Sequence, residues 1–309
     1  QRLDLSSDTN KSAEIEDASV MIYPTDGYGT IEFVRQIMEI EKPDAIMLFT
    51  DPRYWIWLFQ HEREIRSKMP IIYLNIWDDL PYPLYNKPYY ESCDTLFAIS
   101  KQTENINHVV LGDVAKNRLI KYVPHGINEK YFHPVDKTSN DFKEFEKQVL
   151  GNNKFDFITF HNARNLRRKS TSDLILAFKT FIDKLQKQQA DKCALILHTD
   201  AIDDNGTDLP KVIEMLMGDK QKNIYISNQK ITQSQLNYYY NLADITALIS
   251  SNEGWGLSLT ESMMAGTPIL ANVTGGMQDQ MRFEDEDGNW IKFTEQFGSN
   301  HLGKYKKHG

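Results

Sequence analysis

The chain has 309 residues, of which 40% are hydrophobic and 25% are charged, and its formal net charge is −8. These fractions are those of globular proteins and exclude a chain that is disordered or fibrous throughout. The mean hydropathy of −0.52 excludes a protein with many membrane spans, because each span needs about 20 apolar residues. At about 100–200 residues per domain, the length predicts two domains.

The charge is distributed unevenly. Residues 1–150 carry 17 Lys and Arg against 24 Asp and Glu, and residues 151–309 carry 18 against 19. An acidic chain binds nucleic acid poorly, because that binding depends on neutralised phosphates. The balanced second half holds one basic cluster at 164–169, which either binds a small anion or is a solvated loop. Cys93 and Cys193, one in each half, indicate free thiols and a cytoplasmic protein rather than a disulfide.

Short apolar runs alternate with helical patterns along both halves. In the first half, strands are predicted at 20–23, 45–49, 71–74, 95–99 and 119–123, and helices at 31–40, 55–66 and 102–111. In the second half, strands are predicted at 155–160, 193–197, 224–227, 245–249 and 268–271, and helices at 174–185, 209–216, 234–242 and 257–265. Continuous apolar strands between helices are typical of parallel sheets covered on both faces. The pattern therefore predicts an α/β protein with two doubly wound lobes.

A turn-rich segment at 124–136 marks the boundary between the lobes, and 136–153 is polar with little apolar periodicity. We therefore divide the chain into an N-terminal lobe, 1–134, and a C-terminal lobe, 135–309. Ligands of open α/β sheets bind at the carboxyl ends of the strands. The site is therefore expected in a cleft between two facing lobes.

The most informative segment follows the predicted strand 245–249. Glu253 lies in the loop, and Glu261 lies about one turn into the next helix. The glycines here allow a sharp turn and a close ligand approach, and the helix N-terminus favours a phosphate. This predicted binding loop comprises Gly254, Trp255, Gly256, Leu257 and Ser258. The alternative is a tight turn with an acidic residue that favours the helix dipole, but the downstream Gly275 and Gly276 favour a ligand site.

Together, these segments resemble the retaining GT-B glycosyltransferases of family 4, the glycogen-synthase-like and mannosyltransferase-like group. The spacing of Glu253 and Glu261 is that of the family's paired glutamates. Arg164 and Lys169 match the cations of its diphosphate clamp, although Ser170 stands where the family has glycine. Segments 124–134 and 93–100 resemble the family's interdomain segment and a first-lobe strand, so the resemblance covers about residues 20–276.

The resemblance implies a GT-B fold and a metal-independent transfer from a nucleotide-diphosphate sugar, with no cofactor and a GDP- or UDP-sugar as donor. Arg164 and Lys169 would neutralise the leaving diphosphate. Glu261 would hold the ribose hydroxyls, and Glu253 would contact the donor sugar. The family's backbone contact with the base would fall at Gln229, Lys230 and Ile231.

Five further residues are predicted to lie in the site. Asp78, which follows a first-lobe strand, would contact the transferred sugar or the acceptor hydroxyl, or else cap a turn. His125 and His161, at strand-to-loop positions, would touch phosphate or have structural roles. Asp26 and Tyr28 would line the acceptor side, or form an ordinary turn before a helix.

The acceptor is expected to be a glycan, a lipid-linked molecule or a small molecule. The acidic first lobe disfavours a nucleic-acid acceptor, and membrane association is expected to be peripheral at most. Alternatives are a GT-B nucleotide-sugar epimerase and a catalytically silent nucleotide-sugar-binding protein. Residues 1–18 are polar. The resemblance also implies a long C-terminal helix that crosses back to the first lobe, and the sequence up to 304–309 shows no such helix. We therefore expect the first strand and Gly-rich loop of the N-terminal lobe to be missing.

Overall fold

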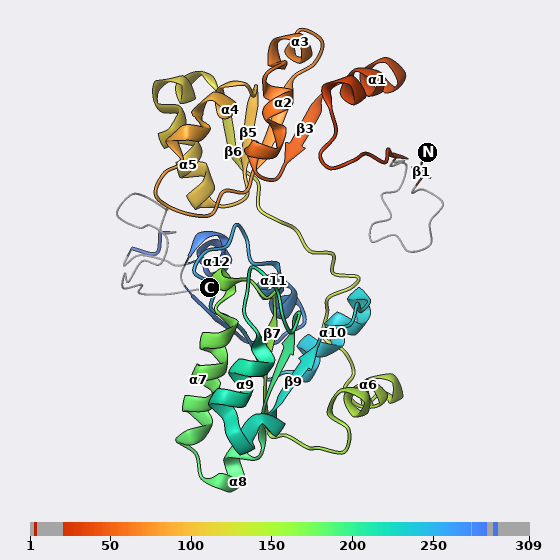
Figure 1. Cartoon of the computed structure of the whole chain (residues 1–309), viewed down its shortest axis with the longest axis vertical. Coiled ribbons are helices and arrows are strands. Elements are labelled where there is room, and N and C mark those ends of the chain that lie inside the picture. The colour runs from red at the N-terminus through yellow and green to blue at the C-terminus, as the bar shows by residue number, and fades with distance from the viewer. Residues whose placement is uncertain (1–2, 5–20, 273, 283–286, 290–309) are drawn as a thin grey trace. The chain divides into compact units, whose positions relative to one another are not determined.

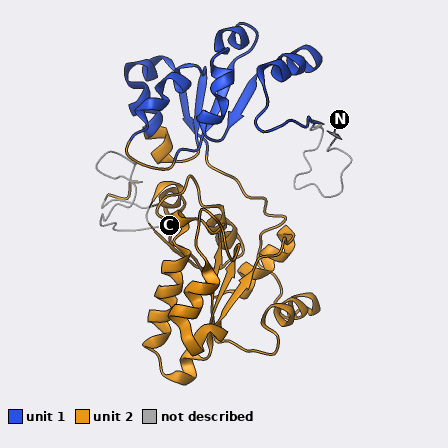
Figure 2. Cartoon of the chain, in the orientation of Figure 1, with its two compact units in different colours: residues 1–77, 82–98, 106–123 blue, residues 78–81, 99–105, 124–309 orange. Residues whose placement is uncertain are grey.

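The computed structural model describes residues 3–4, 21–272, 274–282 and 287–289 (Figure 1). The chain forms two compact units (Figure 2). Unit 1 comprises residues 1–77, 82–98 and 106–123, and unit 2 comprises 78–81, 99–105 and 124–309. The division into lobes at residue 134 stays a prediction, and the expectations for 1–18 and 304–309 fall outside the described residues, apart from 3–4.

Unit 1 is built on a four-stranded parallel sheet. The strands, in spatial order, are β3 (Ile46–Phe49), β4 (Ile71–Asn75), β5 (Thr95–Ala98) and β6 (Leu119–Tyr122). Its helices are α1 (Ile31–Glu41), α2 (Ile56–Phe59), α3 (Glu62–Arg66), α4 (Lys87–Glu91) and α5 (Lys101–Leu111), the last of which continues from unit 2. The helix predicted at 55–66 is therefore two short helices, preceded by a 3₁₀ turn at Pro52–Trp55.

The first predicted strand is not part of this sheet. Strand β2 (Met21–Ile22) pairs antiparallel with β1 (Leu3–Asp4) in a separate two-stranded sheet, and residue 20 lies outside the described residues. Pro24 lies two residues after β2, and it cannot donate a hydrogen bond to a sheet. The strand is therefore confirmed at 21–22, but its place in a parallel sheet is not.

Unit 2 is built on a five-stranded parallel sheet. In spatial order its strands are β11 (Ile269–Ala271), β10 (Ile245–Leu248), β7 (Phe157–Asn162), β8 (Cys193–His198) and β9 (Ile224–Ser227). Its helices are α6 (Asn140–Leu150), α7 (Thr171–Asp183), α8 (Lys187–Ala190), α9 (Leu209–Met217), α10 (Gln233–Leu242), α11 (Leu257–Met264) and α12 (Gly275–Met281). The strand order reverses between β7 and β10, and such a reversal is where open α/β sheets bind ligands.

Helices cover both faces of the unit 2 sheet, as predicted (Figure 1). Strand β8 shows why, because all its residues from Cys193 to Leu197 are buried. Ala194 and Ile196 pack with residues of α6 and α10, whereas Leu195 and Leu197 pack with residues of α7 and α9. Side chains alternate between the two faces of a strand, so a continuous apolar run needs cover on both.

Helix α6 forms within 136–153, where the sequence has little apolar periodicity and no helix is predicted. Ser139 caps the helix, since its side chain accepts a hydrogen bond from the Phe142 N–H at 3.3 Å. Phe142 and Phe145 are buried, and both rings pack against Tyr238 of α10. Apolar residues three positions apart lie on one helix face, and these two rings, with the buried Leu150, anchor a helix that is otherwise polar.

Candidate functional site

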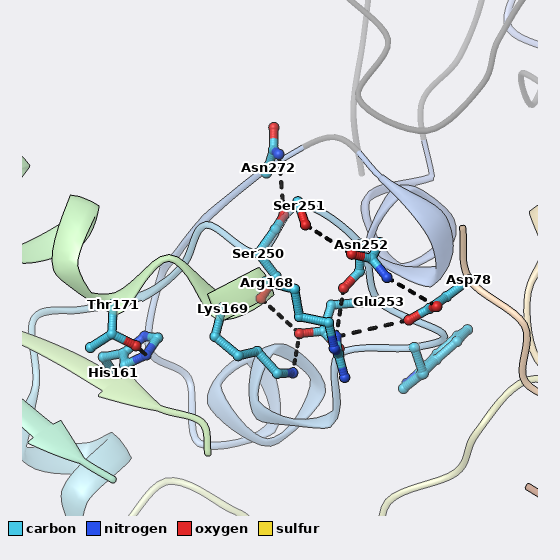
Figure 3. A network of polar contacts seen from close by, with 12 residues as sticks. Asp78, His161, Arg168, Lys169, Thr171, Ser250, Ser251, Asn252, Glu253 and Asn272 are labelled. Atoms are coloured by element: carbon cyan, nitrogen blue, oxygen red, sulfur yellow. Dashed lines mark hydrogen bonds and ion pairs between the residues drawn. The ribbon is translucent and has the colours of Figure 1, made fainter. Parts of the chain in front are cut away.

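The candidate site lies at the carboxyl ends of β7 and β10, where two loops meet (Figure 3). One loop follows β7 and ends in a 3₁₀ turn at Arg167–Lys169. The other follows β10 and carries Glu253. The backbone joins them, because the Ser251 N–H donates to the Arg168 carbonyl at 2.8 Å.

Glu253 is the centre of a buried ion cluster, and its side chain is only 7% exposed. Its carboxylate accepts hydrogen bonds from the Lys169 ammonium, from Ser250 Oγ at 2.7 Å and from Arg168 Nη1 at 3.2 Å. Burial alone would raise the pKa of Glu253, but the charges of Lys169 and Arg168 outweigh it and hold that pKa below its ordinary value. The structure therefore brings together two predicted residues, Lys169 and Glu253, as an ion pair.

Arg168 is a member of this cluster that sequence reasoning missed. Its Nη1 donates to the Asn252 carbonyl at 2.7 Å and lies 3.8 Å from the Asp78 carboxylate. The only sequence signal for Arg168 is its place in the basic run 164–169. Within that run, the family resemblance points to Arg164 and Lys169 instead. A planar guanidinium that contacts both Glu253 and Asp78 ties the two carboxylates to one cation.

Asp78 joins the cluster from the short piece 78–81 of unit 2. Asn252 Nδ2 donates to its carboxylate at 3.0 Å (Figure 3). Burial raises the pKa of Asp78, and the neighbouring Arg168 opposes that rise. The predicted Asp78 thus lies beside Glu253, although its contact with a sugar stays a prediction.

Arg164 and Lys169, the two predicted clamp cations, have different surroundings. The Arg164 side chain is 62% exposed, and its Nε donates to Asp203 at 2.8 Å rather than to the ion cluster. Ser170, which follows Lys169, has a φ of 53°. That left-handed conformation favours glycine, which explains why the resembling family has glycine there.

Glu261 lies on the second turn of α11 and takes no part in the ion cluster. Its carboxylate accepts a hydrogen bond from Tyr240 Oη at 2.5 Å. Burial raises the pKa of Glu261, and the Tyr240 hydrogen bond opposes that rise. Helix α11 begins at Leu257 after Gly256, which has a φ of 87°.

The other residues of the predicted binding loop differ in exposure. Trp255 is buried, and its Nε1 donates to Thr260 Oγ1 at 2.9 Å. Gly254 is half-buried, Ser258 is buried and Leu257 is 41% exposed.

The predicted base-binding residues lie between β9 and α10. Two of them, Gln229 and Ile231, line a pocket of about 290 Å³, and Lys230 is exposed.

The two predicted histidines belong to unit 2. His161 is fully buried, with Nδ1 2.9 Å from the Ala247 carbonyl and Nε2 3.2 Å from Thr171 Oγ1. His125 is half-buried, and burial lowers its pKa. A phosphate contact by either stays a prediction, but the contacts of His161 already give it a structural role.

The last two predicted residues, Asp26 and Tyr28, belong to unit 1. The Asp26 carbonyl accepts from the Gly29 N–H at 3.1 Å, which forms the turn before α1. The Tyr28 ring is 45% exposed and stacks on Tyr54, with ring centroids 4.2 Å apart. Their contact with an acceptor stays a prediction.

The buried imidazole of His161 is expected to make stability depend on pH. Burial lowers its pKa to about 4, so the unfolded chain binds a proton between pH 6.5 and 4 that the folded chain does not. The stability that the neutral His161 imidazole contributes is complete above pH 6.5. As the pH falls from 6.5 towards 4, the free energy of unfolding drops by about 1.4 kcal/mol per pH unit. Urea unfolding at pH 7 and 5 checks this. His161→Asn should lose about 2 kcal/mol less than the parent between these values, and an equal loss in both would contradict the assignment.

Two glycines of α12 allow the Glu253 loop to approach. A Cβ on Gly276 would lie 2.6 Å from Trp255 Cα, and one on Gly275 would collide with the Glu253 carbonyl. We expect Gly276→Ala to lower the free energy of unfolding by about 1–3 kcal/mol and to lower kcat/KM, because the loop must shift. Gly126→Ala is the control, since its Cβ meets nothing within 4 Å. Equal melting temperatures for the two variants would show that the approach is not tight.

Among the described residues, no group of three His, Cys, Asp or Glu side chains is arranged to hold a metal ion. In the same part of the chain, no helix has the length and apolar character needed to span a membrane. Cys93 and Cys193 are both buried free thiols, which confirms that they form no disulfide with each other.

Residues 142–298 match the family model described as "Glycosyl transferases group 1". Over 149 residues the chain is 29% identical to the alpha-monoglucosyldiacylglycerol synthase of Acholeplasma laidlawii, and the match covers 48% of this chain and 34% of that protein. The chain therefore spans about a third of this curated relative.

Solved structures show the fold. Sucrose-phosphate synthase from Thermosynechococcus elongatus superposes with a TM-score of 0.61 at 18% identity, covering 81% of this chain and 61% of the other. The structure described as "Trehalose-6-phosphate from E. coli bound with UDP-2-fluoro glucose" has a TM-score of 0.62 at 15% identity, over 80% of this chain and 63% of the other. These likenesses confirm the predicted two-lobed, Rossmann-like GT-B fold, while this chain covers less than two thirds of either structure.

Proposed function

The chain belongs to the group 1 glycosyl transferases, and from this premise we propose that it moves a sugar from a nucleoside-diphosphate sugar to an acceptor hydroxyl. One observation carries the proposal. Lys169 and Arg168 place two cations around the buried Glu253, at the strand-order reversal where an open α/β sheet binds its ligand.

The cations supply the chemistry that the leaving group needs. As the bond between the sugar carbon and the diphosphate oxygen breaks, negative charge builds on the diphosphate. Lys169, with Arg164 and Arg168, would stabilise that charge more in the transition state than in the bound donor. We propose that these cations replace a divalent metal, so that transfer is independent of metal.

Glu253 and Asp78 have separate proposed roles. The buried Glu253 would orient the donor sugar through its hydroxyls, and Asp78 would contact the transferred sugar or the acceptor. Following the family 4 resemblance, we propose retention at the sugar carbon, with the donor's own phosphate taking the acceptor proton on the same face. Burial raises the pKa of Asp78, which suits a carboxyl group that hydrogen-bonds to hydroxyls.

The donor and acceptor classes are also proposals. Glu261 would bind the ribose, the loop at Gln229 to Ile231 would meet the base, and UDP- and GDP-sugars are the expected donors. A UDP-sugar is supported by one of the similar structures, which is described as bound with UDP-2-fluoro glucose. A lipid-linked acceptor is supported by the name of the curated relative, a glucosyldiacylglycerol synthase. The free thiols support a cytoplasmic location.

Labelled UDP- and GDP-sugars, incubated with a panel of lipid, glycan and small-molecule acceptors, test the proposal. We expect labelled sugar on an acceptor, at a rate unchanged by EDTA. A rate that EDTA abolishes would overturn metal independence alone. Epimerised donor without transfer would indicate an epimerase, and donor binding without turnover would indicate a silent binding protein.

A further inference from the structure

Tyr240 of α10 is a buried tyrosine whose hydroxyl contacts a predicted site residue. Its side chain is fully buried. Its Oη donates to Glu261 at 2.5 Å, and Asn162 Nδ2 at the end of β7 donates to the same Oη at 2.9 Å. A phenol has one proton to donate, and with Asn162 as a donor that proton points at Glu261.

The surroundings of Tyr240 fix this hydroxyl in place. Its ring packs edge-on against Phe160, with centroids 5.1 Å apart, and against Phe132 at 6.1 Å. Its backbone carbonyl accepts from Thr267 Oγ1 at 2.7 Å. The packing of the Tyr240 ring in the core of unit 2 therefore fixes the position of its hydroxyl group.

Glu261 depends on that hydroxyl for its orientation. Tyr240 binds Oε2 of Glu261, and within the described residues it is the one hydrogen-bond partner of this carboxylate. A glutamate side chain has three rotatable bonds, so an unheld carboxylate loses rotamer freedom when it binds a ligand. With Oε2 held by Tyr240, Oε1 is left to accept from a ligand hydroxyl.

We propose that Tyr240, supported by Asn162, is a positioning residue that aims Glu261 at the ribose hydroxyls of the nucleotide. The inference rests on the proposed function, because it takes Glu261 as the ribose ligand. Asn162 lies two residues before Arg164 in the chain. The residue that supports the proposed ribose site and a proposed diphosphate cation therefore lie close together in the sequence at the end of β7.

The test compares affinities for a nucleoside diphosphate and its 2′,3′-dideoxy analogue, measured by calorimetry with UDP or GDP, whichever binds. The parent should prefer the ribose form. Tyr240→Phe removes the hydroxyl and keeps the ring, and it should reduce that preference by about tenfold. Affinity for the dideoxy analogue should stay the same, because that ligand has no hydroxyls for Glu261.

Tyr73→Phe is the matched control. It removes a fully buried hydroxyl from β4 of unit 1, where that hydroxyl donates to the Thr50 carbonyl at 2.8 Å. This variant should keep the parent preference for ribose. In a Glu261→Ala background, Tyr240→Phe should have no further effect on the preference.

The outcomes distinguish a failure of the positioning role of Tyr240 from a failure of the proposed function. A Tyr240→Phe variant with the parent preference would overturn the positioning role and leave the proposed function standing. Equal losses of affinity for both ligands would also overturn it, since they indicate a purely structural hydroxyl. A parent that binds no nucleoside diphosphate, or does not distinguish the analogue, would overturn the proposed function and this inference together.

Discussion

Lys169→Ala should lower kcat for sugar transfer by about 10²–10³-fold, the effect of removing one donor that faces developing charge. The lysine is 13% exposed and is paired with Glu253. Burial lowers the pKa of Lys169, and the neighbouring Glu253 charge opposes that fall and so favours the charged ammonium. Arg168 and Ser250 still contact Glu253 in the variant. Its free energy of unfolding should therefore fall by only about 1–3 kcal/mol.

Lys179→Ala is the control for this variant, because Lys179 also pairs with a carboxylate, Asp183, but on the exposed side of α7. Its kcat should equal that of the parent. Steady-state kinetics and urea unfolding of both variants check the prediction. If Lys169→Ala turned over at the parent rate, the cation would have no role in departure of the diphosphate.

Glu253→Gln should have the second large effect, on stability and on pH dependence together. The substitution keeps the shape but leaves Lys169 and Arg168 without their shared counter-charge, which should cost about 3 kcal/mol of folding free energy. Without the Glu253 charge the pKa of Lys169 falls further, since that charge raises it in the parent. Lys169 then loses its proton at lower pH, so the variant's affinity for nucleoside diphosphate should weaken as the pH rises.

Glu64→Gln gives the matched control, because Glu64 pairs with Arg35 at 2.7 Å on the surface of unit 1. An exposed pair of this kind adds little to stability, and its loss should leave diphosphate binding unchanged. Calorimetric affinities at several pH values provide the measurement. A Glu253→Gln variant whose affinity has the parent pH dependence would show that Glu253 does not govern the charge of Lys169.

Most of the unit 2 sheet could be predicted, because its strands are buried on both faces. The run from Cys193 to Leu197 is apolar at every position, and only a covered parallel strand needs that pattern. Helix α6 was missed because its buried face comes from Phe142, Phe145 and Leu150 alone, in an otherwise polar segment. Strand β2 was predicted at the right residues but in the wrong sheet, because a short apolar run says nothing about its pairing partner.

The candidate site could likewise be predicted only in part. The pairing of Lys169 with Glu253 follows from loops at the ends of two strands, β7 and β10, that lie side by side in the predicted kind of sheet. Arg168 and Lys169 lie in a 3₁₀ turn, and the sequence spacing does not predict which cations of the run 164–169 turn inward there. Arg168 was therefore missed, and the outward position of Arg164 was not foreseen. The contact of Tyr240 with Glu261 joins two helices that sequence spacing does not relate.

The central claim is that the Lys169–Glu253 cluster of unit 2 binds the diphosphate of a nucleotide sugar. Calorimetric titration of the parent and of Lys169→Ala with UDP, GDP and their monophosphates tests it most directly. We predict that one diphosphate binds the parent at least about tenfold more tightly than its monophosphate, and that Lys169→Ala removes this difference. A parent with no preference for the diphosphate, or a Lys169→Ala variant that retains it, would contradict the claim.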